Sequence, residues 1–524
     1  MALAGRSLHS GRAMTPRDTA AATYENPAPT HGMTPAQLRA AFFRTFPAVA
    51  PAIVIGAIDQ TIVAAALPAI AGSLGALESV SWVVVSYLIA ATVAAPVCGQ
   101  LGDALGRRRL LLVSLALHAA GSAVAAAAGS FGWLLAGRLL QGAGGGGLNT
   151  LTMAIIAEAV PPRERGRFQA WIAGCFTLAS ALGPVAGGWL TGAFGWRAVF
   201  LVQLPAAALA FAMALRAPAR PGTAHSGARL RFDGPGVVLF AAFVAPALFA
   251  LSLAQGLSLA ALPGVALLAA GAALALWLLL WRERRLRHPL LPLGLLAEPT
   301  VLRSNLFTAC GHGALVGLLT FLPIYLQSAR SLEPGAVGVL LLPMAVGGGI
   351  GGLSAGRLMA ATGWSSPLAA AGLALATAGL AAAALLAATL PVSGLAMLFG
   401  VVAFGIGLSY PVSQINTQVA AGPARLGAAG ASVQFARTFG AAFATALLGA
   451  LLFGSLAAGD PRVAELFAEV VRDGAAAVLP RLPGPEHAAL REGLAAAFRA
   501  AFLGAAALTT LGAFMAWRVP LRRV

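Results

Sequence analysis

Apolar segments long enough to cross a membrane recur along most of the chain, and short polar or basic stretches separate them. A spanning helix needs about 20 mainly apolar residues. The pattern predicts 14 spans, at 46–68, 81–101, 110–129, 132–156, 168–190, 198–215, 234–254, 260–281, 304–327, 335–355, 367–388, 392–418, 429–453 and 498–517. The pair at 234–281 is the least regular, because Pro246 and Pro263 interrupt it. Since spanning β-strands would be short and alternate in hydropathy, the predicted fold class is an all-α polytopic membrane protein.

The spans group into predicted domains, with a tail at each end of the chain. Residues 1–45 are polar and rich in Pro, Thr, Ser and Arg, which predicts a disordered tail without the apolar core of a signal peptide. The long loop at 455–497 mixes acidic residues with Arg, and predicts a small helical cap of two amphipathic stretches. The other predicted domains are a six-helix bundle at 46–215, a linker with two extra spans at 216–303, a second six-helix bundle at 304–517 that includes the loop, and a tail at 518–524.

Basic residues fall on one side of the predicted membrane. If the N-terminus is cytoplasmic, the inner short loops hold 17 Arg residues, whereas the outer short loops hold only Arg197 and Arg330. This positive-inside bias predicts that both tails are cytoplasmic, with an even number of spans. The location that we predict is the cytoplasmic (inner) membrane of a bacterium. It also explains the net charge of +17, so the charge is no sign of a nucleic-acid partner.

Few residues offer covalent, metal or cofactor chemistry. The three cysteines, Cys98, Cys175 and Cys310, lie far apart in apolar segments and lack the spacing of metal ligands. The sequence contains no Walker motif, metal cluster or nucleophile constellation. We therefore expect neither an enzyme nor a cofactor, and any uphill transport has to be coupled to an ion.

Asp59 is the only acidic residue deep inside a predicted span. A carboxylate at mid-membrane costs about 2.5–3.5 kcal/mol on insertion scales, so we expect it to carry a proton, meet a cationic ligand or pair with a buried base. Arg138 lies in the span 132–156, with Gln141 one turn further on. A buried Arg requires an acid nearby, and Asp59 is available. The alternative is that Arg138 extends to the outer interface, where its helix begins.

Other polar residues within spans are candidates for a substrate cavity. Arg437 either pairs across the bundle or lines the cavity, and the sequence leaves both open. His118 and His312 are single helical histidines, which pack in a core more often than they relay protons. The span 392–418 carries a polar patch, part of which we expect to line the cavity: Tyr410, Gln414 and Asn416. Gln141 of the span 132–156 is a further candidate for the cavity.

The stretch GQLGDALGRRR, which follows the second span, has a specific spacing of glycine and charge. Gly99 and Gly106 allow close backbone approach at the turn between two helices. Asp103 can meet an Arg or the positive end of a helix, and Arg107 and Arg108 face the cytoplasmic surface.

A second copy of this stretch, GRLMAATG at 356–363, keeps the Gly, Leu and Gly of 99–106. It has Ala360 where the first copy has Asp103, and no Arg run follows. Two six-helix halves related by a parallel duplication would explain the match. Chance similarity in a chain so rich in Gly and Ala is the alternative.

The stretch GQLGDALGRRR resembles the signature loop of the major facilitator superfamily. AIDQTIVAAALP at 57–68 is similar to the helix-1 motif of the superfamily's 14-helix drug:proton antiporters, the QacA/EmrB-like group. GRLLQGAGGGG at 137–147 resembles the motif with a membrane-embedded Arg. GPVAGGWL resembles the antiporter motif, carried here by Gly183, Pro184, Gly187 and Gly188.

This resemblance implies two six-helix bundles plus two central helices, and export of amphipathic, cationic drugs or toxic metabolites by proton antiport. It implies that Asp59 and Arg138 couple transport to protons. The partners are then a small molecule, protons, the lipid bilayer and, in a host with an outer membrane, a periplasmic adaptor. The alternatives are one narrow endogenous substrate, a proton-coupled importer, or a scaffold or sensor that transports nothing.

The chain also departs from the pattern of the family. Ala64 and Ala65 stand where the helix-1 motif often has polar residues, which puts the expected range of ligands in doubt. Ala104 stands where the signature loop usually has a basic residue.

Overall fold

The structure is a computed structural model of the chain. It describes residues 35–74, 82–160, 162–216, 233–255, 262–286, 290–330, 332, 334–458, 462–463, 465–467, 469 and 482–523. The chain divides into two units at Ala40, and the described residues from Ala41 onward form the second one. All contacts reported below lie within the second unit.

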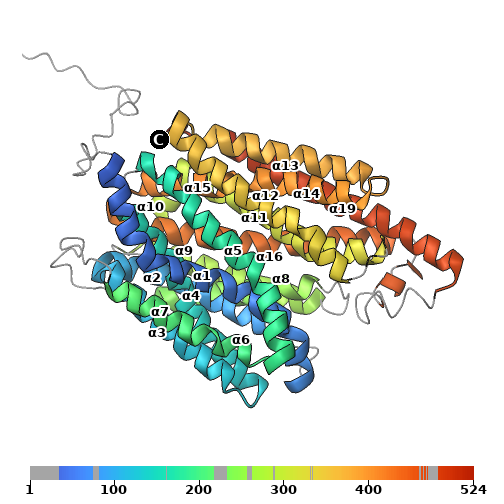
Figure 1. Ribbon diagram of the computed structural model, residues 1–524, viewed down its shortest axis with the longest axis horizontal. Helices are drawn as coiled ribbons and strands as arrows, with labels where there is room; N and C mark the ends of the chain where they lie inside the picture. The colour runs from blue at the N-terminus through green and yellow to red at the C-terminus, as the bar shows by residue number, and fades with distance from the viewer. Residues whose placement is uncertain are drawn as a thin grey trace, which may run out of the picture. The chain divides into compact units, whose positions relative to one another are not determined.

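Nearly every described residue belongs to a helix (Figure 1). The α-helices are α1 (Pro35–Leu74), α2 (Trp82–Leu105), α3 (Arg107–Ala126), α4 (Phe131–Ala159), α5 (Pro162–Phe194), α6 (Ala198–Leu201), α7 (Gln203–Arg216), α8 (Gly234–Gln255), α9 (Leu262–Glu283), α10 (Leu293–Leu296), α11 (Pro299–Ser328), α12 (Pro334–Thr362), α13 (Ser366–Leu386), α14 (Val392–Gly407), α15 (Ser409–Ala421), α16 (Leu426–Ala458) and α19 (Gly484–Trp517). This confirms the predicted all-α class.

Twelve candidate membrane spans are found among the described residues. They include the less regular pair α8 and α9, where Pro246 is accommodated inside α8 and Pro263 is the second residue of α9. The long helices α4 and α5 are not among the twelve. The four consecutive glycines of α4 lower its hydropathy. The total of 14 spans stays a prediction.

Two boundaries differ from the predicted ones because helices continue beyond the membrane-length segments. α1 begins at Pro35, so residues 35–45 are helical, while residues 1–34 of the predicted tail lie outside the described residues. α19 begins at Gly484 and includes the second part of the predicted loop, since Leu490 and Leu494 are buried in the core. At the C-terminus, Arg522 accepts a hydrogen bond from the N–H of Ser365 (3.0 Å), so this tail is bound to the loop after α12.

Buried apolar side chains form separate cores in the two halves of the chain. The largest core draws only on residues from α11 onward, and two others draw only on α1 to α7. The halves meet where α2 packs on α16 and where α5 packs on α12. Gly99 of α2 and Gly427 of α16 lie so close that a Cβ atom on Gly99 would come within 2.6 Å of the Gly427 carbonyl oxygen.

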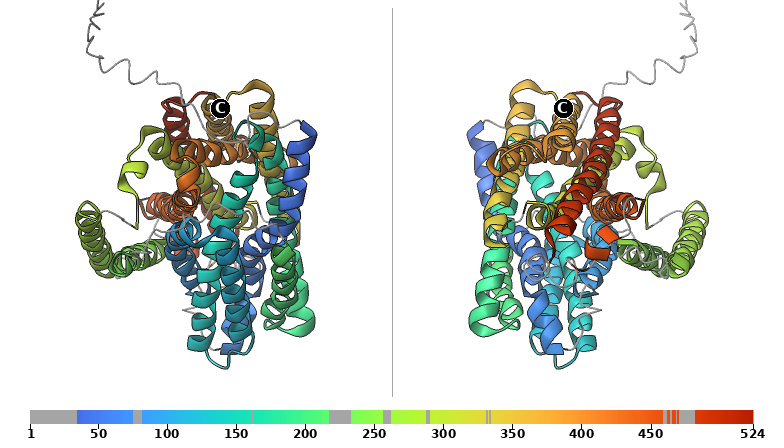
Figure 2. Two further views of the ribbon diagram at one scale, coloured as in Figure 1. Left: turned by 90° about the vertical axis from the view of Figure 1, so that its left-hand side faces the viewer. Right: turned by 90° about the vertical axis from the view of Figure 1, so that its right-hand side faces the viewer.

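The two central helices lie beside the contact between α2 and α16. Phe240, Val244 and Leu248 of α8 form a small core with Val93 of α2 and Phe435 of α16. α9 packs mainly on α8, and Figure 2 shows both as yellow-green helices to one side of the other helices. The hairpin of α8 and α9 therefore contacts both halves mainly through α8.

The repeated stretches have the same backbone turn. Gly106 follows α2 with φ of 100°, and Gly363 follows α12 with φ of 71°. Both values lie in the left-handed region that favours glycine. Gly195 after α5 and Gly422 after α15 also have positive φ, so this is a general way of ending helices in the chain and the duplication stays a prediction.

Candidate functional site

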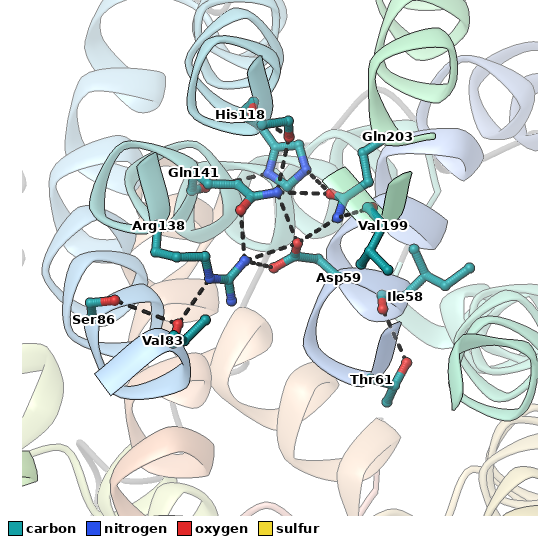
Figure 3. A network of polar contacts seen from close by, with 11 residues as sticks. Ile58, Asp59, Thr61, Val83, Ser86, His118, Arg138, Gln141, Val199 and Gln203 are labelled. Carbon is teal, nitrogen blue, oxygen red and sulfur yellow. Dashed lines mark hydrogen bonds and ion pairs between the residues drawn. The ribbon is translucent and has the colours of Figure 1, made fainter. Parts of the chain in front are cut away.

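Polar side chains from three helices, α3, α4 and α7, gather around Asp59 of α1, together with a backbone carbonyl of α2 (Figure 3). Nη1 of Arg138 donates hydrogen bonds to both carboxylate oxygens, at 3.1 and 2.9 Å. Asp59 is fully buried, and the side chain of Arg138 is only 1% exposed. This pairing provides the counter-charge that each ion requires in an apolar interior.

The position of Arg138 is fixed by further contacts with α2. Its Nε donates to the carbonyl oxygen of Val83 at 2.9 Å, and its guanidinium lies 4.5 Å from the ring centroid of Tyr87. The alternative that Arg138 extends to the outer interface is therefore wrong, because its charge is directed inward toward Asp59.

Gln141 and Gln203 supply two more donors to the carboxylate. The side-chain nitrogens of both residues lie 2.9 Å from Oδ1 of Asp59. A carboxylate only accepts hydrogen bonds, so the amide oxygen of Gln203 faces away from Asp59, toward Nε2 of His118 at 2.9 Å. The same oxygen accepts a hydrogen bond from the side-chain nitrogen of Gln141 at 2.9 Å, so His118 and Gln141 together hold the Gln203 amide in this orientation.

The glycine run of α4 brings these helices together. A Cβ atom on Gly145 would meet the Tyr87 hydroxyl of α2, and one on Gly144 would lie 2.5 Å from the Ser114 carbonyl oxygen of α3. Only glycine allows α4 to approach both neighbours at this distance. The resulting contact places Arg138 and Gln141 beside α1, α2 and α3.

The signature-like loop joins the two halves at one end of the bundle, which we call the Arg-rich end because Arg107, Arg108 and Arg109 lie there. Oδ1 of Asp103 accepts hydrogen bonds from Arg107 and, at 3.3 Å, from the N–H of Gly427 at the start of α16. Both partners expected for Asp103 are thus present.

The first two arginines of this loop make further contacts at the Arg-rich end. Arg107 also pairs with Glu158 of α4 and donates to the carbonyl oxygen of Pro423 at 3.4 Å. Arg108 donates to the Ala214 carbonyl oxygen at the end of α7 at 3.0 Å. Arg107 is thus buried between the halves, and it does not extend to the surface.

The antiporter-like motif lies where α5 meets α1. A Cβ atom on Gly183 would lie 1.9 Å from Oγ1 of Thr61, and one on Gly187 would lie 2.4 Å from the carbonyl oxygen of Ile62. A Cβ atom on Gly188 would have no neighbouring atom within 4 Å. α5 continues as a helix through Gly183 and Pro184.

The second half contains a smaller polar cluster. The guanidinium of Arg437 lies 4.6 Å from the ring centroid of Tyr410 and 3.5 Å from Nε2 of His312. Asn416 does not join this cluster, because its side chain donates to Oγ of Ser366 at 3.1 Å. Gln414 is buried, and its side-chain nitrogen lies close to Gly430 of α16: a Cβ atom added to this glycine would be 3.8 Å away.

Sequence reasoning missed Gln203 and Tyr87 and left His118 open. Gln203 offered one signal, since it is an amide within a predicted span. The direction in which the Gln203 side chain points depends on how α7 packs on α3. The spacing of residues along a single helix does not define this packing.

These features define a polytopic helical membrane protein with a buried acid–base pair, typical of a transport protein. Residues 49–445 match the family model of the Major Facilitator Superfamily. The chain belongs to this superfamily, a family of transporters and not of enzymes.

Relatives are similar over most of the chain. An uncharacterised MFS-type transporter of Mycobacterium tuberculosis is 32% identical over 475 residues, which cover 90% of this chain and 68% of the relative. The multidrug transporter protein MdtP of Bacillus subtilis is 29% identical over 410 residues, or 76% of this chain and 73% of the relative.

Solved structures share the fold at low sequence identity. The human organic anion transporter MFSD10 is 18% identical, with a TM-score of 0.57 over 91% of this chain and 99% of that one. The transporter FucP in its outward conformation is 17% identical, with a TM-score of 0.58 over 91% of this chain and 99% of that one.

Proposed function

We propose that this chain is a proton-coupled secondary transporter that exports amphipathic small molecules, among them cationic drugs or toxic metabolites, by alternating-access antiport. The observation that carries the proposal is the ion pair of Asp59 and Arg138, buried among membrane-length helices and held by two glutamine amides. An ionisable residue inside a membrane marks an ion or substrate pathway by default.

Proton uptake by Asp59 changes the electrostatics of the whole cluster. In the ionised state, the carboxylate balances Arg138 and accepts hydrogen bonds from Gln141 and Gln203. A protonated Asp59 no longer balances Arg138, which then remains as a buried cation. That state favours a rearrangement that brings Arg138 to water or to another partner, and it is the coupling step that we propose.

A cationic substrate has to compete with Arg138, because the carboxylate of Asp59 is fully buried. Binding of the cation and binding of the proton to Asp59 are then mutually exclusive, which is the basis of antiport. Arg437 and Tyr410 line the part of the route in the second half. The similarity to MdtP, which is described as a multidrug transporter, supports this substrate class.

The proposed orientation places the Arg-rich end in the cytoplasm, in the inner membrane of a bacterium, following the positive-inside bias. With α4 and α5 counted as spans, the chain has the 14 helices of the drug:proton antiporter group. In a host with an outer membrane, a periplasmic adaptor would carry the substrate onward. A pull-down from such a host that recovers no adaptor would contradict this part.

Export of one narrow endogenous substrate is the second candidate function. It is favoured by Ala64 and Ala65, which remove polar groups from the α1 segment near Asp59. Such a protein would keep the same coupling residues and reject common dyes.

The test is ethidium uptake by energised inverted vesicles, with the pH of the lumen recorded. Wild type should take up dye and release protons from the lumen, whereas Asp59→Asn should do neither. Glu486→Gln, a change at the half-exposed first turn of α19, should behave like wild type. Dye uptake without proton movement would contradict antiport, and no dye uptake by wild type would favour the narrow substrate.

A further inference from the structure

The end of α9 carries an exposed surface that takes no part in the site around Asp59. The opposite face of α9 packs inward through Ala272, Ala275, Leu279 and Glu283. On the outward face, Trp277 is 60% exposed and Trp281 is 49% exposed. Arg284 and Arg285 follow at seven and eight residues from Trp277, so all four side chains share one helix face.

The charges at this end are divided between the two faces. Arg282 donates to Oδ1 of Asp233 at 2.8 Å, which joins the end of α9 to the start of α8. Glu283 accepts hydrogen bonds from the N–H groups of Leu290 and Leu291, at 3.2 and 3.3 Å. Arg282 and Glu283 thus hold the hairpin and the loop after it. Arg284 and Arg285 are exposed and make no ion pair with any residue that the structure describes.

A shallow pocket lies between these outward side chains. Its walls are Trp277, Leu280, Trp281, Arg284 and Arg285. The guanidinium of Arg285 stacks on the ring of Trp281, with 3.9 Å to the centroid. The stacking holds Arg285 against Trp281, so the pocket has a cationic end at the two arginines and an apolar wall at Trp277 and Leu280.

We propose that this pocket binds the headgroup of an anionic phospholipid from the leaflet at the Arg-rich end. Guanidinium groups match the geometry and charge of a phosphate. Trp277 and Leu280 lie one to two helical turns before the two arginines, on the side of the membrane interior. There they contact the glycerol and the first acyl carbons of the bound lipid. A soluble phosphate would use only the cationic end, so the apolar wall favours the lipid.

The experiment is native mass spectrometry of delipidated protein in detergent, titrated with phosphatidylglycerol or phosphatidylcholine. Wild type should retain phosphatidylglycerol in preference to phosphatidylcholine. Each basic residue near an anionic surface strengthens binding roughly fivefold, so Arg284→Gln/Arg285→Gln should bind about 30-fold more weakly. Trp281→Leu keeps both charges and removes the stacking surface, and it should weaken binding by a smaller factor.

The matched control is Arg109→Gln/Arg216→Gln, which removes two exposed arginines of the Arg-rich end on other helices. This variant should retain the lipid like wild type. An equal loss in both double variants would show a general effect of charge and overturn the proposal. Equal retention of the two lipids, or full displacement of phosphatidylglycerol by inorganic phosphate, would overturn it as well. Each variant's melting temperature in the same detergent identifies any loss caused by misfolding.

Discussion

Oδ1 of Asp103 accepts a hydrogen bond from the backbone N–H of Gly427 over 3.3 Å, and so joins the end of α2 to the start of α16. The same oxygen accepts from Arg107, which in turn reaches the Pro423 carbonyl oxygen. A single carboxylate therefore links the two halves at the Arg-rich end. Close by, Leu426 packs against Ala154 and Ala157 of α4.

Asp103→Asn should weaken this link, because it removes the negative charge and leaves the shape nearly unchanged. Hydrogen bonds to charged groups contribute about 1.5–3 kcal/mol, so opening at this end should become at least about tenfold more frequent. The measurement is thiol labelling of Leu426→Cys in a chain without its native cysteines. An equal labelling rate with Asp103 and with Asn at this position would contradict the proposed link between the two halves.

Removing one member of the Asp59–Arg138 pair should cost more than removing both. Asp59→Asn leaves Arg138 as a buried, unbalanced charge, and such changes destabilise proteins by about 3–5 kcal/mol. Asp59→Asn/Arg138→Gln should recover most of this loss in a thermal or denaturant melt. Transport should stay absent in the double variant, which separates coupling from folding. Additive losses in stability would contradict a direct pair.

Gly187→Ala and Gly188→Ala should differ sharply although the two glycines are adjacent. The methyl group at 187 would lie 2.4 Å from the Ile62 carbonyl oxygen, whereas the one at 188 has no neighbour within 4 Å. Overpacking of this kind costs about 1–3 kcal/mol. We expect a lower melting temperature and reduced transport for the first variant, and wild-type values for the second. Identical behaviour would mean that α1 and α5 are not in this contact.

Gln203→Leu should weaken the site without removing a charge. The change deprives Asp59 Oδ1 and His118 Nε2 of a partner at 2.9 Å each, and a buried unsatisfied group costs about 1–3 kcal/mol. The pH profile of transport should shift along with stability. Glu486→Gln, a change at the half-exposed first turn of α19, is the control and should leave the pH profile unchanged. A pH profile unchanged in Gln203→Leu would exclude Gln203 from the coupling cluster.

The sequence predicted the helical class because hydropathy alone defines membrane-length segments. It also predicted that Arg138 needs an acid and that Asp59 is available, since both are charges in apolar surroundings. It could not predict the roles of Tyr87, His118 and Gln203, because their contacts depend on how α2, α3 and α7 rotate against α4. The early starts of α1 and α19 were missed for another reason: these turns are amphipathic and lie outside the apolar windows.

Because the buried pair has no net charge, its protonation state decides whether the membrane potential can drive transport. Asp59 and Arg138 together carry no net charge, so the cluster itself is indifferent to the membrane potential when both are ionised. Protonation of Asp59 gives the cluster a net charge of +1. Any movement of the protonated cluster across the electric field is then worth up to about 2.3 kcal/mol per 100 mV. The inside-negative voltage and the pH gradient would therefore act on the same step, and a voltage clamp could resolve one from the other.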